Sequence, residues 1–228
     1  MQPKPRTLQI LDLVTVLFFL AAVGMVFFYA PLEAVMGQVQ RVFYFHVATA
    51  WVGMLGFLVA AIAGVAYLVK QDRKWDIVGL SAVEISLVFF FIAIVSGSIW
   101  AKPSWGTWWT WEPRLTTAAI VELVYAAYLL LRQGLEDPER RARFGAVYAI
   151  LGFISVPLTF ISIRLFRTIH PVVVGSGAAA FDMSPAMLQT FLFSLWTFSL
   201  VFADLLWHRI RLGRLAERVE ALKLKIND

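Results

Sequence analysis

Six long apolar stretches, separated by short polar ones, dominate the pattern of hydrophobic and polar positions along the chain. The hydrocarbon core of a bilayer is roughly 30 Å thick and a helix rises about 1.5 Å per residue, so about 20 apolar residues make one membrane span. The pattern therefore predicts an all-α membrane bundle. Its six transmembrane helices should cover about residues 8–30, 44–69, 78–100, 115–131, 145–165 and 186–207.

The segments between these stretches are too short to form a soluble domain with a core of its own. We predict one membrane domain over residues 1–208, with an outer loop at 100–114, and a basic tail over 209–228. Pro157 should kink the fifth span. Apolar residues recur at helical spacing in the tail, so it is either an amphipathic helix on anionic lipid or a helix that docks a partner.

The distribution of positive charge predicts how the helices are oriented. If the N-terminus is cytoplasmic, fifteen of the twenty Lys and Arg residues fall in inner segments and five in outer segments. Basic residues favour the cytoplasmic side, so both termini should lie inside. The net charge of +5 mostly reflects this asymmetry and gives no reason to expect a nucleic-acid partner.

Tryptophan is concentrated in one outer segment. Five of the nine tryptophans fall within twelve residues: Trp100, Trp105, Trp108, Trp109 and Trp111. Tryptophan favours membrane interfaces, but an aromatic belt would be spread over many helix ends. Rigid aromatic side chains supply a large contact area at little entropic cost. The cluster therefore favours a binding surface for a large, flat, apolar ligand over simple anchoring.

His46 and His170 are predicted at the same outer level, whereas His208 lies at the inner end of the last span. A lone interfacial histidine is usually a polar group in contact with water. Two at one depth beside a tryptophan-rich segment could instead hold a metal between them, and imidazole is a common axial ligand of haem. Both interpretations of the pair remain open on spacing alone.

Arginine is unusually common among the outer basic residues. Four of the five are Arg41, Arg114, Arg164 and Arg167. Arg41 and Arg167 precede the two outer histidines by five and three residues. Arginine pairs with carboxylates such as the haem propionates, although contact with lipid headgroups explains one or two of the four.

Two further features concern the remaining chemistry of the chain. Glu84, Glu122 and Asp204 lie within predicted spans, where charge is costly, and we assign them no role. The chain has no cysteine, which excludes a CxxCH haem-attachment motif. Any haem would therefore be bound non-covalently, as haem b.

The segment WGTWWTWEPRLT, Trp105–Thr116, resembles the tryptophan-rich signature WGxWWxWD of haem-handling proteins in cytochrome c biogenesis. Its RLT continuation resembles the cytochrome c maturation protein C subfamily. Further stretches that resemble this subfamily are RVFYFH at 41–46, AW at 50–51, TIH at 168–170 and PAMLQ at 185–189. The resemblance covers nearly the whole chain.

This resemblance implies a haem-delivery protein rather than an enzyme, in the bacterial cytoplasmic membrane with its haem site on the periplasmic side. His46 and His170 would be the axial ligands, and the tryptophan loop would grip the porphyrin. The implied partners are a periplasmic haem chaperone, ABC transporter subunits and a small single-span protein. The positions that match the family motifs are His46, His170, Trp105, Gly106, Trp108, Trp109, Trp111 and Arg114.

The chain departs from the family pattern at two places. Glu112 followed by Pro113 stands where an aspartate is usual, and Leu165, Phe166 and Arg167 stand where aromatic residues and asparagine are common.

Two other functions are compatible with a haem-binding bundle: a subunit that moves haem across the membrane, and a b-type cytochrome that transfers electrons. A transporter should show broken helices or a polar path, and a cytochrome should show more histidines inside the spans.

Overall fold

The computed structural model describes residues 3–166, 169–170 and 183–227. Six helical segments in this part of the chain are long and apolar enough to cross a membrane, which confirms the predicted all-α bundle. The helices are α1 (Arg6–Gly24), which continues as a π-helical turn (Met25–Tyr29), a short 3-10 turn (Gln38–Gln40), α2 (Arg41–Lys70), α3 (Arg73–Trp105), α4 (Pro113–Gln133), α5 (Pro138–Phe153), α6 (Ser155–Leu165) and α7 (Pro185–Asn227).

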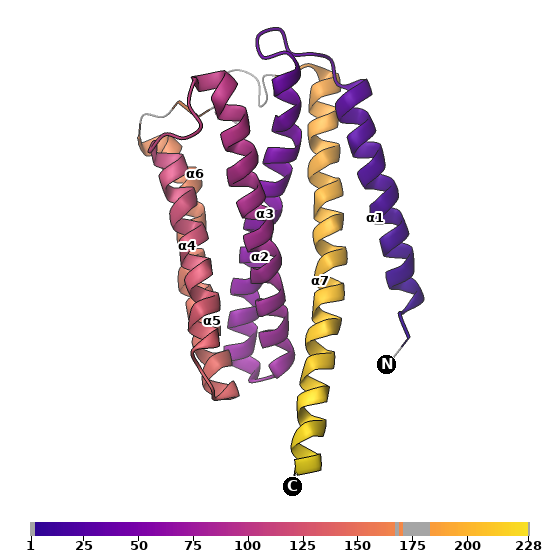
Figure 1. Ribbon diagram of the computed structural model, residues 1–228, viewed down its shortest axis with the longest axis vertical. Coiled ribbons are helices and arrows are strands. Elements are labelled where there is room, and N and C mark those ends of the chain that lie inside the picture. Colours follow the sequence, from indigo (N-terminus) through magenta and orange to yellow (C-terminus); the bar gives the residue numbers. More distant parts are fainter. Residues whose placement is uncertain (1–2, 167–168, 171–182, 228) are drawn as a thin grey trace.

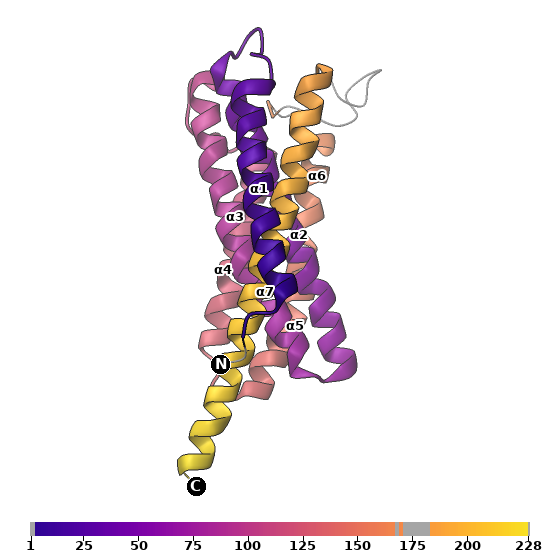
Figure 2. The same ribbon diagram turned by 90° about the vertical axis from the view of Figure 1, so that its right-hand side faces the viewer.

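The helices form three groups side by side. α2 and α3 lie in the middle, α4, α5 and α6 on one side, and α1 and α7 on the other (Figure 1). Both chain ends lie at one end of the bundle, which we call the tail end (Figures 1 and 2). The connection between α3 and α4 lies at the opposite end, which we call the site end.

Close packing of α2 against α3 builds the centre of the bundle. A Cβ atom at Gly53 would lie 2.8 Å from the Cβ of Phe90, so only glycine permits this approach of the two backbones. Small residues serve the same purpose in other membrane helix pairs. On the next turn of α2, Phe57 stacks on Tyr125 of α4 with ring centroids 3.7 Å apart. Residues of α2 share one buried core with residues of α3, α4, α5, α6 and α7.

The fifth span is divided where the sequence predicts a kink. α5 ends at Phe153 and α6 begins at Ser155, two residues before Pro157. The proline ring has no N–H to donate and clashes with the carbonyl four residues earlier, which is that of Phe153. The Ser155 hydroxyl donates a hydrogen bond of 2.6 Å to the Gly152 carbonyl and satisfies one group that the break exposes.

The sequence predicts an outer loop over residues 100–114. This prediction is wrong for residues 100–105, because α3 continues through Trp105. Pro103 lies in the last turn and does not stop the helix. Gly106 ends it with φ +76°, a left-handed conformation that favours glycine, and donates its N–H to the Lys102 carbonyl at 3.0 Å. The connection is therefore only residues 106–112, and Trp100 and Trp105 are placed by a rigid helix.

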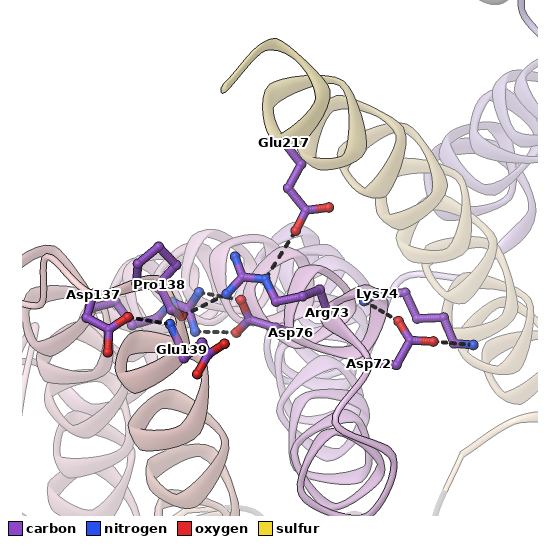
Figure 3. Close-up of polar contacts among 9 residues, drawn as sticks. Asp72, Arg73, Lys74, Asp76, Asp137, Pro138, Glu139 and Glu217 are labelled. Carbon is purple, nitrogen blue, oxygen red and sulfur yellow. Dashed lines mark hydrogen bonds and ion pairs between the residues drawn. The ribbon is translucent and has the colours of Figure 1, made fainter. Parts of the chain in front are cut away.

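The basic tail is not a separate element. α7 continues through 43 residues, or about 65 Å, roughly twice the thickness of the hydrocarbon core. Its last turns project along the axis of α7 beyond the other helices (Figure 1). Residues up to Glu217 still contact α3, because Arg209 binds Glu84 and Arg73 binds Glu217 at 3.2 Å (Figure 3). Only the turns after Glu217 leave the bundle, and they do so along the line of the span.

A buried ion pair joins α3 to α4 at the tail end. Arg132 donates two hydrogen bonds to the Asp76 carboxylate, at 2.6 and 3.0 Å, and both side chains are 7% exposed. The same guanidinium lies 5.6 Å from the centre of the Tyr128 ring. Gly145 of α5 lies against it, where a Cβ atom would overlap the guanidinium. Three helices thus meet around one charge pair.

We predict that Asp76→Ala lowers the free energy of unfolding by about 3–5 kcal/mol, because it leaves the Arg132 charge buried without its counter-ion. Thermal unfolding in detergent, followed by circular dichroism, measures the loss. Glu220→Ala is the matched control, because Glu220 forms only an exposed pair with Lys223. It should cost less than about 0.5 kcal/mol. Equal losses in the two variants would contradict the proposed importance of the buried pair.

Candidate functional site

A cavity of about 550 Å³ lies at the site end, between α2, α3, α4, α6 and α7. Small-molecule and cofactor sites usually measure about 300–1,000 Å³. Its lining is mainly apolar, with a few polar and aromatic groups that converge on it. Among the lining residues are two histidines, four tryptophans and two arginines: His46, His170, Trp51, Trp100, Trp105, Trp109, Arg114 and Arg164.

His46 is held against α3 in one orientation. Its Nδ1 lies 2.9 Å from the carbonyl oxygen of Ala93 and 3.4 Å from the Ser96 hydroxyl. Because a carbonyl only accepts, Nδ1 carries the proton and donates it, and the lone pair is on Nε2. A Cβ atom at Gly97 would lie 2.8 Å from Cε1 of the ring, so the glycine makes room for the imidazole.

His170 follows α6 and lines the same cavity. Its ring meets that of Trp105 edge to face at 5.7 Å between centroids, and its Nδ1 lies 3.6 Å from a carboxylate oxygen of Glu112. Burial, with the positive charge of Arg114 and then His46, lowers the pKa of His170 to about 3. The imidazole is therefore neutral at pH 7, the form that binds a metal.

The tryptophan-rich segment divides into two groups. Trp105 and Trp109 line the cavity. Trp108 and Trp111 point outward, with 56% and 77% of their surface exposed. Lys102 lies 6.0 Å from the centre of the exposed Trp108 ring. The structure thus brings only part of the motif to the cavity and presents the rest at the surface of the site end.

The connection between α3 and α4 fixes this division. Gly106 turns the chain at the end of α3, and Glu112 caps α4 by accepting a hydrogen bond of 3.1 Å from the N–H of Leu115. Pro113 is the first helical residue, where a missing N–H costs nothing. The unusual Glu112–Pro113 pair is therefore a helix start. It directs Arg114 into the cavity lining.

The four outer arginines lie in different places. Arg114 and Arg164 both line the cavity. The Arg41 guanidinium lies 5.4 Å from the centre of the Phe27 ring, and Arg41 is not among the lining residues. Arg167 lies outside the described residues. Arg41 lies near His46 in the sequence, but it does not line the cavity. The structure brings Arg164 to the cavity instead.

The sequence interpretation also missed the groups that hold His46. The Ala93 carbonyl and the space above Gly97 belong to α3, 47 and 51 residues away in the chain. A signal was present, because Ala93 and Gly97 are small and lie one helical turn apart at the predicted depth of His46. Small residues at that spacing often mark the close approach of another helix.

The remaining titratable groups of the spans lie elsewhere. His208 lies 3.7 Å from Asp204, and Glu84 binds Arg209 at 2.6 Å, so these acids have partners on or beside α7. Glu122 is half-buried on α4. None of these five residues is part of the cavity lining. The chemistry of the cavity is therefore that of its own histidines, arginines and tryptophans.

This set of groups defines the kind of ligand that fits. The apolar walls and the tryptophan rings suit a large, flat, apolar molecule. Two imidazoles can ligate a metal, and two guanidiniums can pair with carboxylates. A metal porphyrin with acidic side chains satisfies all of these requirements, whereas a simple lipid or a free metal ion satisfies only some of them.

Comparison with known proteins gives a consistent result. Residues 2–225 match the family described as heme exporter protein C. A heme exporter protein C of Bradyrhizobium diazoefficiens is 32% identical over 86% of this chain and 74% of its own length. That of Escherichia coli is 31% identical over 81% of this chain and 74% of its own. A putative cytochrome c biosynthesis ccmC-like mitochondrial protein of Marchantia polymorpha is 28% identical over 62% of this chain and 59% of its own.

Proposed function

The chain belongs to the heme exporter protein C family, and on this basis we propose that it binds haem in the site-end cavity and delivers it to a haem chaperone for cytochrome c biogenesis. One observation carries the proposal. Two histidines far apart in the sequence line one apolar cavity together with tryptophan and arginine side chains. Each kind of group has a counterpart in haem: the iron, the porphyrin ring and the propionates.

His46 and His170 are the axial ligands in this proposal. The bond from Nδ1 of His46 to the Ala93 carbonyl fixes the tautomer that has its lone pair on Nε2. Glu112 lies 3.6 Å from Nδ1 of His170, a longer contact on the same side of the ring, which leaves Nε2 for the iron. Each imidazole would then ligate iron through Nε2. Haem is held without a covalent bond to the chain, as haem b.

The two groups of tryptophans have different roles. Trp105 and Trp109 would contact the porphyrin, since both line the cavity. Trp108 and Trp111 are exposed at the site end, where a soluble partner can reach them. Arg114 and Arg164 are placed to pair with the propionates. Binding and handover would therefore depend on different residues of one motif.

The positive-inside bias supports an orientation in which the site end faces the periplasm across the bacterial cytoplasmic membrane and both termini lie in the cytoplasm. In this orientation the projecting part of α7 extends into the cytoplasm, away from the lipid surface. This favours the interpretation of the tail as a helix that docks a partner over the interpretation as a helix on lipid. ABC transporter subunits and a small single-span protein are the partners that the family resemblance implies.

The break between α5 and α6 is a feature that a transporter also shows, but the other features expected of the two alternative functions find no support among the described residues. A cytochrome that carries electrons across the bilayer needs a second haem, but His208 lies 2.8 Å from Asp12 at the tail end and has no second histidine beside it. A haem path through the bundle needs polar groups along its length, but Glu84 is paired with Arg209. We therefore favour delivery from one face over transfer across the membrane.

We predict that His46→Ala and His170→Ala each lower bound haem by roughly tenfold or more. Mutation of a residue that only orients a metal ligand typically lowers metal affinity about 10–100-fold, so loss of the ligand itself should cost at least as much. The visible spectrum of the purified protein measures both haem content and iron coordination. His208→Ala is the control and should keep the parent spectrum. Parent spectra in both outer variants would refute the ligand assignment.

Gly97→Ala should lower haem binding by about tenfold, because its methyl group would displace the His46 ring from the Ala93 carbonyl. Gly79→Ala is a matched control on the same helix, since a Cβ there makes only ordinary contacts of 3.6 Å or more. Haem titration of the purified variants distinguishes the two. Normal affinity in Gly97→Ala would show that the His46 position is not critical.

Trp108→Ala/Trp111→Ala should retain the haem spectrum but reduce transfer, because both rings lie outside the cavity. Trp109→Ala should instead reduce haem binding itself. Each variant is co-expressed with a tagged periplasmic haem chaperone, and haem is measured on both proteins. If the double variant loads the chaperone at the parent level, the exposed tryptophans are only interfacial anchors.

A further inference from the structure

We propose that haem enters the cavity sideways, from the lipid of the membrane, through an opening between α6 and α7. This inference rests on the proposed haem-binding function and identifies the route to that same cavity. It follows from the packing of the helices, the exposure of the cavity wall, and the position of the arginines relative to the apolar lining.

The packing leaves this side of the cavity without a helix–helix seal. α6 packs against α4 and α5, whereas α7 packs against α1, α2 and α3. In the described part of the chain, α6 and α7 form no extended interface with each other. Figure 1 shows α6 and α7 on opposite sides of the α2–α3 pair. Both nevertheless contribute residues to the cavity lining, so among the described residues the wall between these two helices consists of side chains.

The side chains at this opening are large, apolar and exposed. Phe160 of α6, Leu192 of α7 and Trp51 of α2 line the cavity, and 43%, 47% and 43% of their surfaces are exposed. All three lie within segments that can span the membrane. Leu192 is seven residues into α7, or about 10 Å from its first residue along the helix axis. The opening therefore faces acyl chains near one membrane surface.

The opening is closed on the side that faces the tail end. The indole N–H of Trp51 donates a hydrogen bond of 3.0 Å to the hydroxyl of Ser199, two turns below Leu192 on α7. This bond joins α2 to α7 and satisfies the indole N–H at membrane depth. Entry is therefore confined to the part of the wall above Trp51, which is the part beside His46 and His170.

The arginines match the orientation that haem has in a bilayer. Arg114 is the second residue of α4 and Arg164 is next to the last residue of α6, so both lie at helix ends near the membrane boundary. An amphiphilic porphyrin in lipid keeps its ring among the acyl chains and its carboxylates at the boundary. Lateral movement into the cavity preserves this arrangement, and the carboxylates reach the guanidiniums without crossing the apolar layer.

The chain has no cysteine, so a pair of introduced cysteines tests the route cleanly. Phe160→Cys/Leu192→Cys is placed in lipid nanodiscs and bridged with a bis-maleimide that contains a cleavable disulfide. Haemin is then supplied in phosphatidylcholine vesicles. Bridging before haemin is added should slow loading at least tenfold, and reductive cleavage should restore the unbridged rate. Bridging after loading should retain the haem.

The matched control ties α7 to α1 on the other side of the bundle. Phe18 and Phe193 stack there at 5.5 Å between ring centroids, and neither lines the cavity. Bridged Phe18→Cys/Phe193→Cys should load haemin at the unbridged rate. If the bridged 160/192 pair also loads at that rate, the lateral route is refuted. If the parent chain binds no haemin at all, the proposed function fails instead.

A second variant tests the route without any bridge, in case the double cysteine variant binds haemin poorly. Leu192→Trp narrows the opening and should slow both the loading and the release of haemin. Leu205→Trp, on an exposed position of the same helix outside the cavity, should leave both rates unchanged. Parent rates in Leu192→Trp would also overturn the lateral route.

Discussion

The close approach of α2 and α3 is the constraint on which the candidate site depends. A membrane interior offers little hydrophobic drive for helix association, so side-chain packing and hydrogen bonds must hold the pair together. Gly53 allows α2 to meet Phe90, and Gly97 allows α3 to meet His46. The same contact brings the Ala93 carbonyl to Nδ1 of the imidazole. Packing, tautomer and ring orientation are thus set by one interface.

The two ends of the bundle are built on opposite principles. At the tail end, Arg132 and Asp76 are buried and satisfy each other, and the void beside Asp76 measures only about 10 Å³. At the site end, the helices separate around a large cavity, and His46 and His170 face it. A compact, ion-paired base can hold α3, α4 and α5 in register while the other end remains open. Stability and ligand access are therefore separated along the length of the same helices.

The six spans and the break at Pro157 could be predicted because they depend on local properties, namely apolar length and the missing N–H of proline. The shared depth of His46 and His170 followed from the same span boundaries. The two sides of the tryptophan motif could not be predicted, since the left-handed Gly106 and the Glu112 cap decide which rings turn inward. The cavity position of Arg164, rather than Arg41, could not be predicted, because distance along a chain says little about which helix faces a cavity.

The unbroken course of α7 gives the molecule a mechanical property. Phe191 and Leu192 belong to the cavity wall, and Glu217, about seven turns further along the same helix, is bound to Arg73 at the opposite end. An α-helix resists bending, so the whole segment moves as a stiff rod about the points where it crosses α2 and α3. A small sideways force on its projecting end would tilt the wall at the other end. The helix that borders the cavity is therefore a rigid connection between the site end and the tail end of the bundle.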